Sequence, residues 1–366
     1  GISMAQKGSI KKVFPGGNTS RGFYSFYDQI IPEDAARIFI IKGGPGVGKS
    51  SFMKTIAEEF LKQGYDVEFH YCSSDNKSLD GLVIKKANVA LLDGTAPHVV
   101  DPKNPGAVDE ILNLGEYWNE SGLVKDKQEI INYNRQIKLR FFSAYRYLES
   151  AREMQDDMEV IIGEGVDREK LNRLKIKLRN ELVDGVNIIS RAPGIRHLFD
   201  SAITPDGLVD YIETIILGNY ICYYLKGGVG PVSSDILSYL AGEYNLKGYA
   251  AELYHQPLNP DRLQTLVVEG LKIAVTVNPK MEARAYQIID LNAVIDESKS
   301  EDKEELLAKD KVMYSLMLEE GVRRIKLAKL LHDDMEKSYV GNMDFAGITE
   351  LRNKVVERIK AILKNR

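Results

Sequence analysis

The sequence predicts an α/β protein with two tandem three-layer α/β/α domains, each with a mostly parallel sheet followed by a helical hairpin. Its 366 residues exceed what one compact core usually holds, so two domains are expected. Short apolar runs such as Arg37–Lys42 alternate with helical patterns such as Ser50–Lys62, which is typical of a doubly wound sheet covered on both faces. The third observation is an internal repeat.

The repeat aligns Lys42–Glu68 with Lys226–Glu252 without a gap, at a constant offset of 184 positions, and 10 of 27 positions are identical. Unrelated sequences of average composition would share roughly two. Weaker similarity continues on both sides, and a helical pattern ending at Glu159 resembles one ending at Glu336. We therefore infer a duplication and place the boundary between its halves near residues 186–193.

Each half begins with strands and ends with long helices. Apolar runs rich in β-branched residues predict parallel strands, and a run ended by proline predicts a short fourth one. Apolar residues then recur at steps of three and four, which predicts an antiparallel helix pair in each half. The expected strands of the first half are Arg37–Lys42, Val67–Tyr71, Val89–Leu92 and His98–Asp101. The expected helix pairs lie in 126–183 and in 302–331 with 349–363, and the expected segments are 1–125, 126–185, 186–297 and 298–366.

A glycine-rich loop follows the first of these strands. GGPGVGKS, at Gly43–Ser50, fits G-x-x-x-x-G-K-[ST] in full, which makes the expected fold P-loop NTPase-like. Its glycines let backbone N–H groups point at a phosphate, and the following helix adds its dipole. We expect Lys49 to reach the β- and γ-phosphates, Ser50 to ligate Mg²⁺ and Ser51 to approach the α-phosphate. The expected nucleotide-binding residues are Gly43, Gly44, Pro45, Gly46, Val47, Gly48, Lys49, Ser50 and Ser51.

A carboxylate at the end of a neighbouring buried strand usually completes such a Mg²⁺ site, and VALLD supplies Asp93. The alternative is that Asp93 starts a turn with Gly94. Because Gly94 replaces the acidic residue that often activates water at this position, we look elsewhere for catalytic groups. Asp75 and His98 are the candidates, although Asp75 could instead cap a following helix and His98 could be a structural histidine.

The second half lacks these chemical groups. At the repeat offset the loop lysine becomes Ser233, the glycine before it becomes Val232, and the strand-end aspartate becomes Val277. Because hydrogen bonds to charged groups contribute about 1.5–3 kcal/mol each, we expect one working site and a structural or regulatory second half. No correctly placed N-K-x-D motif for a guanine base is present, which favours ATP over GTP.

Composition excludes several classes of protein. The formal net charge of −4 argues against a general nucleic-acid binder, and no apolar stretch resembles a signal peptide or a membrane span. Cys72 and Cys222 lie in separate apolar runs without metal-ligand spacing, so we expect a cytoplasmic protein with neither a disulfide nor a zinc site. The basic helix Arg168–Arg179 could contact an anionic partner, although a solvent-exposed charged face explains it better.

Three segments, GGPGVGKS, DGTAPHVVDPKNPGAVDEILNLGEYW and RHLFDSAITPDG, together resemble a poorly characterised bacterial family of tandem-repeat P-loop ATPases and nucleotide-binding proteins. The resemblance covers nearly the whole chain. It implies ATP binding at Gly43–Ser51 and a cytoplasmic protein, and it implies no particular substrate. In that family the second half often keeps a complete loop, so Ser233 and Val277 are departures from its pattern.

The leading hypothesis is a Mg²⁺-dependent ATPase in which Lys49, Ser50 and Asp93 hold the nucleotide and turnover moves the helical appendages. The first alternative is a kinase for a small molecule or nucleotide, with an acceptor pocket formed by the loops around Asp75 and His98. The second alternative is a scaffold that binds ATP without hydrolysis. The helical appendages are the expected surface for a protein partner or for a homo-oligomer.

Overall fold

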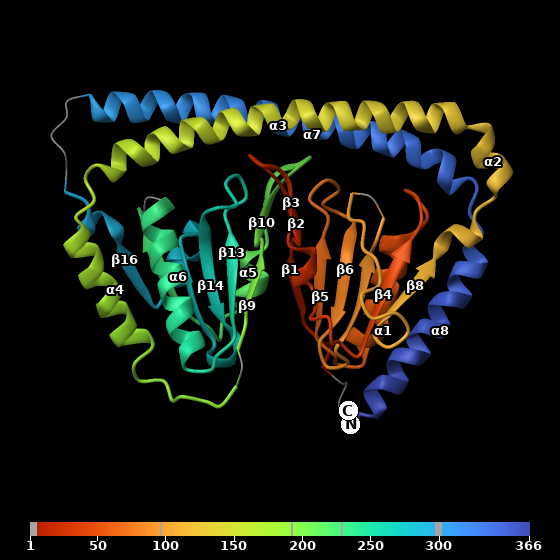
Figure 1. Ribbon diagram of the computed structural model, residues 1–366, viewed down its shortest axis with the longest axis horizontal. Helices are drawn as coiled ribbons and strands as arrows, with labels where there is room; N and C mark the ends of the chain where they lie inside the picture. The colour runs from red at the N-terminus through yellow and green to blue at the C-terminus, as the bar shows by residue number, and fades with distance from the viewer. Residues whose placement is uncertain (1–5, 96, 192, 228–229, 297–301) are drawn as a thin grey trace.

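A computed structural model shows the α/β fold expected from the sequence. Two six-stranded mixed sheets form two tandem α/β domains, each followed by helices. Figure 1 shows the sheets standing side by side beneath two long helices, α3 (Lys127–Gly163) and α7 (Lys303–Val340). In the part of the chain that is described, no helix is both long and apolar enough to cross a membrane. The structure describes residues 6–95, 97–191, 193–227, 230–296 and 302–366.

The first sheet has the strand order β1-β5-β6-β7-β4-β8. β6 runs antiparallel to both of its neighbours, and the other strand pairs are parallel. This order places the strand before the glycine loop, β4, directly beside β7, the strand that ends at Asp93. The strands are β1 (Ile10–Val13), β4 (Arg37–Lys42), β5 (Val67–Tyr71), β6 (Leu79–Ile84), β7 (Val89–Asp93) and β8 (Asp109–Asn113).

Two expectations about this sheet are not met. Asp75 does not cap a helix, because the chain turns there and enters β6. The segment His98–Asp101 is a loop, and the strand beside β4 is β8 instead. In this loop Lys42 Nζ donates hydrogen bonds to the carbonyl oxygens of Gly94 and Val100 at 2.7 and 2.8 Å, which hold the segment after β7 against β4.

The second sheet repeats the first, with the order β9-β13-β14-β15-β12-β16. Even an uncommon backbone conformation is repeated, because Asn88 and Lys272 lie one repeat offset apart and both have a φ of 53°. Asparagine tolerates this left-handed region better than lysine does, so the turn belongs to the duplicated fold rather than to the residue type. The strands are β9 (Ile195–Leu198), β12 (Ile221–Lys226), β13 (Ala251–His255), β14 (Leu263–Val268), β15 (Ile273–Thr276) and β16 (Gln287–Asp290).

The two sheets meet through the ends of β1 and β9. The amide N of Phe14 donates to the carbonyl oxygen of Phe199 at 2.9 Å, and the amide N of Phe199 donates back at 3.0 Å. Equivalent residues of the two halves therefore pair with each other, as they would about a two-fold axis. Other short elements are the hairpin strands β2 (Gly16–Thr19), β3 (Gly22–Ser25), β10 (Ser201–Thr204) and β11 (Gly207–Asp210), and 3₁₀ helices at Tyr27–Gln29, Leu114–Tyr117, Glu269–Leu271, Pro279–Arg284 and Leu291–Val294.

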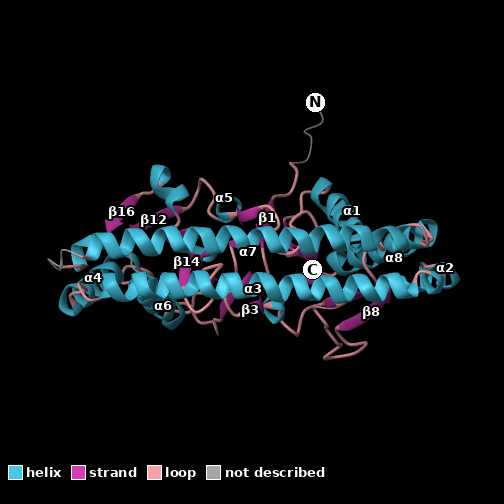
Figure 2. Ribbon diagram, turned by 90° about the horizontal axis from the view of Figure 1, so that it is seen from above, coloured by secondary structure: helices cyan, strands magenta, loops and turns pink. Residues whose placement is uncertain are grey.

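The long helices exchange between the two halves. α3 and α7 run antiparallel and side by side (Figures 1 and 2), so closely that a Cβ on Gly321 would lie 2.8 Å from Cδ2 of Leu148. α3 thereby carries α4 to the second domain, where it packs on α6, and α7 carries α8 back to the first domain, where it packs on α1. The hairpin expected within each half thus takes a different form, because each long helix finds its antiparallel partner in the other half. The other helices are α1 (Lys49–Lys62), α2 (Glu120–Lys125), α4 (Arg168–Leu182), α5 (Ile212–Ile215), α6 (Gly230–Leu246) and α8 (Phe345–Lys364).

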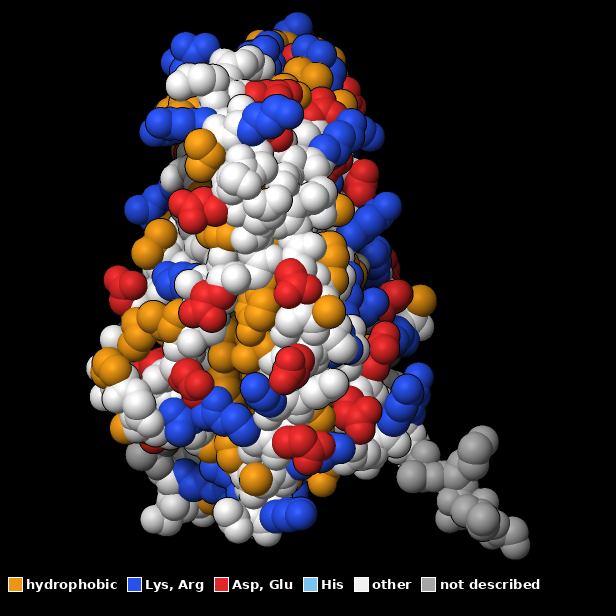
Figure 3. Space-filling view, turned by 90° about the vertical axis from the view of Figure 1, so that its right-hand side faces the viewer, with side chains coloured by type: hydrophobic (Ala, Val, Ile, Leu, Met, Phe, Trp, Pro, Cys, Tyr) orange, Lys and Arg blue, Asp and Glu red, His pale blue; other side chains and the backbone are white. Residues whose placement is uncertain are grey.

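The end of the molecule that carries α8 has a mixed surface. Figure 3 shows basic and acidic side chains interspersed over this face, with hydrophobic side chains between them. Among the residues described there, basic side chains form no continuous patch on this face.

Candidate nucleotide site

The glycine loop connects the end of β4 to the start of α1. Gly46 and Gly48 have φ values of 69° and 86°, in the left-handed region that favours glycine, and Gly48 is the N-cap of α1. Val47 between them is fully buried and anchors the loop to the core, whereas Pro45 is half-buried. The first N–H groups of a helix have no partner within the helix, so this loop has the backbone form that an anion requires.

Lys49 joins the loop to the neighbouring strand. Its Nζ donates to the carbonyl oxygen of Gly43 and to Oδ1 of Asp93, both at 3.1 Å, and also to the Thr95 hydroxyl. The same Asp93 oxygen accepts a hydrogen bond from the Thr95 amide at 3.0 Å. The structure therefore brings Lys49 and Asp93, two of the residues singled out from the sequence, into contact. It adds Thr95, which the sequence analysis missed because a threonine two residues after a strand end carries no recognisable signal.

Ser50 has a second task in this structure. Its Oγ accepts a hydrogen bond from the Leu79 amide at 2.9 Å, and at the repeat offset the Oγ of Ser234 accepts one from the Leu263 amide at 2.8 Å. The serine thus connects the start of the helix to the antiparallel strand in both halves, which explains why the second half retains it without a lysine before it. Ser51, one residue further, is exposed.

Asp75 and His98 lie in different environments. Asp75 accepts a hydrogen bond from the Ser78 hydroxyl at 2.9 Å and lies 3.7 Å from Nζ of Lys329. His98 Nε2 lies 3.1 Å from Oδ2 of Asp80. Burial disfavours protonation of His98, but the charge and hydrogen bond of Asp80 outweigh burial and raise its pKa. Asp75 thus lies close to a lysine of α7, which belongs to the other half, whereas His98 pairs with the carboxylate of Asp80.

The glycine loop is covered by α7, which the sequence did not predict. A Cβ on Gly44 would lie 2.4 Å from Cε1 of Tyr339, and one on Gly46 would lie 3.1 Å from the carbonyl oxygen of Glu336. The end of α7 is also fastened to the first domain, where the amide N of Asp344 donates to the carbonyl oxygen of Tyr117 at 2.6 Å. Similarity between the two helical patterns was the only signal for this region, and it does not say what the helix packs on.

Three ionisable side chains of α7 lie near Asp75 and Lys49: Lys329, His332 and Glu336. His332 Nδ1 lies 3.4 Å from Oε1 of Glu336. Burial raises the pKa of Glu336, and the charge of Asp75 raises it further against the opposing charge of Lys329. Burial also lowers the pKa of His332. The positive charge of Lys49 acts on both groups, so the second half contributes a lysine and two proton-accepting groups to the surroundings of the loop.

At the second loop, a carboxylate lies at the start of α6. A Cβ on Gly230 would lie 2.4 Å from Oε1 of Glu159, so this carboxylate sits at the N-terminus of α6, where negative charge is stabilised. Arg262 Nη2 pairs with Oε2 of Glu159 at 3.2 Å, and Val232 is only 5% exposed. Residues 228–229 of this loop lie outside the described chain. A cavity of about 370 Å³ adjoins this terminus, with Glu159 and Val232 in its lining.

Comparison with known proteins adds one partial likeness. A family model described as Nephrocystin 3, N-terminal matches residues 25–85, the stretch that contains β4, the glycine loop, α1, β5 and β6. No curated protein matches the chain, and no solved structure matches it. The likeness is confined to the loop-bearing part of the first half and carries no information on substrate or partner.

Proposed function

We propose that the chain binds Mg–ATP at the glycine loop of its first half and hydrolyses it there, while the second half has no turnover of its own. The observation that carries this proposal is the position of Lys49, whose Nζ lies 3.1 Å from both the Gly43 carbonyl oxygen and Oδ1 of Asp93. A lysine held between such a loop and a strand-end carboxylate can exchange these partners for phosphate oxygens when a nucleotide arrives.

The oxygen donors beside Lys49 suit magnesium. Mg²⁺ prefers hard oxygen ligands and keeps several waters, and the Ser50 hydroxyl and Asp93 carboxylate are such ligands. Asp93 is already oriented by hydrogen bonds from Lys49 and Thr95. When bound, Mg²⁺ would neutralise charge on the β- and γ-phosphates. The loop N–H groups and Lys49 would hold the same phosphates and keep them in one orientation.

Within this proposal, Glu336 orients the attacking water. Gly94 leaves no acidic residue directly after Asp93, whereas Glu336 lies over the loop. Burial raises the pKa of Glu336 toward the range that suits a general base. Lys329, 3.7 Å from Asp75, adds positive charge that would stabilise the transferred phosphoryl group. Both Glu336 and Lys329 belong to the second half, so α7 would complete the site.

Calorimetric titration of the intact chain with Mg–ATP tests the proposal, with Lys49→Ala and Ser233→Ala as matched variants. We expect one binding site per chain and no change for Ser233→Ala. Losing one charge-assisted hydrogen bond worth about 1.5–3 kcal/mol should weaken binding of Lys49→Ala by about 10- to 150-fold. Two equivalent sites, or unchanged affinity in Lys49→Ala, would contradict the proposal.

ADP formation in the same samples separates the competing activities. Turnover without any acceptor supports hydrolysis, turnover that appears only with an added metabolite supports a kinase, and binding without turnover supports a scaffold. We also propose that the protein belongs to the tandem P-loop family and works in the reducing environment of the cytoplasm. Both Cys72 and Cys222 are free thiols in the structure, which suits a reducing compartment.

A further inference from the structure

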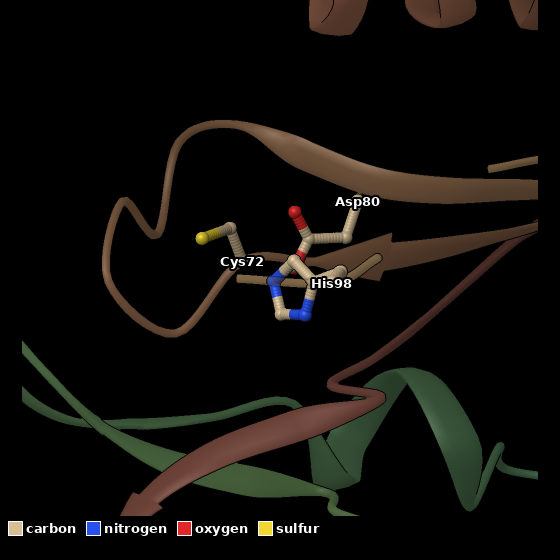
Figure 4. A group of neighbouring side chains, drawn as sticks. All are labelled: Cys72, Asp80 and His98. Carbon is tan, nitrogen blue, oxygen red and sulfur yellow. The ribbon is translucent and has the colours of Figure 1, made fainter. Parts of the chain in front are cut away.

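Three potential metal ligands meet beside the nucleotide site. Cys72 follows the end of β5, Asp80 lies in β6 and His98 follows β7; Figure 4 shows them together. One donor atom from each lies within 4.8 Å of the others, and the Oδ2 of Asp80 is 3.1 Å from Nε2 of His98. Asp80 is 5% exposed and His98 is 8% exposed. Cys72 is partly exposed, so two of the three side chains are buried, unlike those of an ordinary surface group of acidic residues.

The geometry differs from that of a Cys–His–Asp catalytic relay. A relay uses the two ring nitrogens separately, one for the nucleophile and one for the carboxylate. Here the carboxylate of Asp80 takes Nε2, and the thiol of Cys72 lies beside the same edge of the ring (Figure 4). Nδ1 of His98 has no hydrogen-bond partner among the described residues. The three donor atoms therefore lie around one point instead of forming a linear hydrogen-bonded relay.

The donor types select a transition metal. Thiolate and imidazole favour Zn²⁺ over Mg²⁺ or Ca²⁺, and Zn²⁺ bond lengths of about 2.0–2.3 Å put tetrahedral donors roughly 3.3–3.8 Å apart. Small side-chain movements would bring the present donors to that separation.

The second half offers a direct comparison. The Cys72 amide donates to the Ser78 carbonyl oxygen at 2.9 Å, and at the repeat offset the Gln256 amide donates to the Arg262 carbonyl oxygen at 2.8 Å, so the two turns are equivalent. Gln256 thus stands in place of the cysteine, and the same offset puts glutamine in place of Asp80. The thiol and carboxylate are confined to the half that also carries the complete glycine loop.

We propose that Cys72, Asp80 and His98 bind one Zn²⁺, with a fourth position open to water. The ligands come from two segments that contact the glycine loop. Cys72 and Asp80 lie on the β5–β6 hairpin, where the amide of the residue before Asp80 donates a hydrogen bond to Ser50. His98 lies in the segment after β7, where Lys49 donates a hydrogen bond to the Thr95 hydroxyl. The zinc ion holds these two segments in a fixed relative position. Zinc binding does not depend on the proposed ATPase activity, whereas any effect of zinc on nucleotide binding rests on that proposed function.

Cobalt substitution tests the site directly. The intact chain is stripped with a chelator and titrated with Co²⁺, whose thiolate complexes have a charge-transfer absorption. We expect the band in the wild-type protein and in Cys222→Ser, and its loss in Cys72→Ser. Cys222 is the matched control because it is 2% exposed and belongs to no potential metal cluster among the described residues. No band in the wild type, or a band that survives in Cys72→Ser, overturns the proposal.

Zinc content gives a second, independent measurement. Purified wild-type protein should hold one Zn²⁺ per chain by elemental analysis in the presence of millimolar Mg²⁺, and His98→Gln should bind zinc about 100-fold or more weakly in a competition assay. Lys49→Ala should keep its zinc, so failure of the zinc site and failure of the nucleotide site are distinguishable. If Cys72→Ser is unfolded by circular dichroism, His98→Gln decides the outcome, and unchanged zinc affinity in it contradicts the site.

Discussion

The ring of Tyr339 lies against the backbone of Gly44. A Cβ on Gly44 would stand 2.4 Å from Cε1 of Tyr339, nearer than real Cβ atoms come to a neighbour. One residue belongs to the glycine loop of the first half and the other to the last turns of α7. The approach of a helix from one half to the loop of the other therefore depends on the absence of a side chain at this position.

Gly44→Ala should destabilise the protein by about 1–3 kcal/mol because the added methyl group overpacks this contact. Tyr339→Ala should remove the obstacle, so the double variant should be more stable than the sum of the single effects by about 1 kcal/mol. Urea unfolding of the four proteins measures this coupling. Gly185→Ala is the control, since a Cβ there would meet nothing within 4 Å. Strictly additive effects would show that the two residues do not touch in solution.

Glu336→Gln should separate binding from turnover. Removing a negative charge near the phosphate site should tighten Mg–ATP binding about fivefold, corresponding to about 1 kcal/mol of repulsion. Removing the group assigned to orient water should lower ADP formation about 100-fold. Calorimetry and a coupled ADP assay measure the two effects. Glu319→Gln, an exposed change on the same helix, should alter neither, and undiminished turnover in Glu336→Gln would rule out its assigned role.

The two halves also share a buried ion cluster. Arg196 pairs with Glu68 at 2.8 Å and with Glu252 at 3.0 Å, and Lys11 Nζ lies 2.5 Å from Glu252. The Glu68 carboxylate is buried, which by itself disfavours its charge, but Arg196 more than compensates, with help from His70 and Lys11, and holds the pKa of Glu68 well below its usual range. Opposite charges therefore alternate across the junction of the domains.

Arg196→Ala should cost about 3–5 kcal/mol of unfolding free energy, because two buried carboxylates lose a partner. Arg173→Ala removes an exposed pair with Glu169, whose side chains are 76% and 73% exposed, and should cost at most about 1 kcal/mol. Denaturant unfolding of the two variants at neutral pH measures the difference. Equal, small losses would mean that solvent reaches the cluster and screens it.

Asp200 should make stability depend on pH. Burial, reinforced by the charge of Asp210, raises the pKa of Asp200 to about 7. Between the unfolded value near 4 and this folded value, the native state holds a proton that the unfolded state has released, so stability falls as pH rises through this window. From pH 5 to pH 7 the loss should be about 2–3 kcal/mol.

Asp200→Asn should abolish this component, because the amide cannot titrate. Urea unfolding at pH 5, 6, 7 and 8 should show the wild type losing stability relative to Asp200→Asn, with no further relative change above pH 8. Asp206→Asn, at an exposed carboxylate nearby, should follow the wild type. Parallel curves for wild type and Asp200→Asn would show that Asp200 is ionised in the folded protein throughout the range.

Local signals in the sequence were sufficient for much of the first domain. The strands Arg37–Lys42 and Val67–Tyr71 have the predicted bounds. The first is a nearly continuous apolar run that stops at the glycine loop, as a buried parallel strand does. The contact between Lys49 and Asp93 was also predictable, since neighbouring parallel strands end at the same edge of a sheet. β6 was missed because Asp80 and Gly81 interrupt its apolar pattern and resemble a turn.

The sequence by itself determined that the chain is duplicated, that each half is α/β and that only the first half carries a complete glycine loop with a lysine. The tertiary structure decided which helix covers that loop and which residues meet beside it. An apolar stripe on a helix predicts that the helix packs on something, but it does not identify the partner. The pairing of α3 with α7 was therefore not predictable, because it depends on the tertiary contacts that bury Leu148 and Ile325 in one cluster. Likewise, Cys72, Asp80 and His98 come together only because strand order in the sheet, rather than spacing along the chain, sets the distance between them.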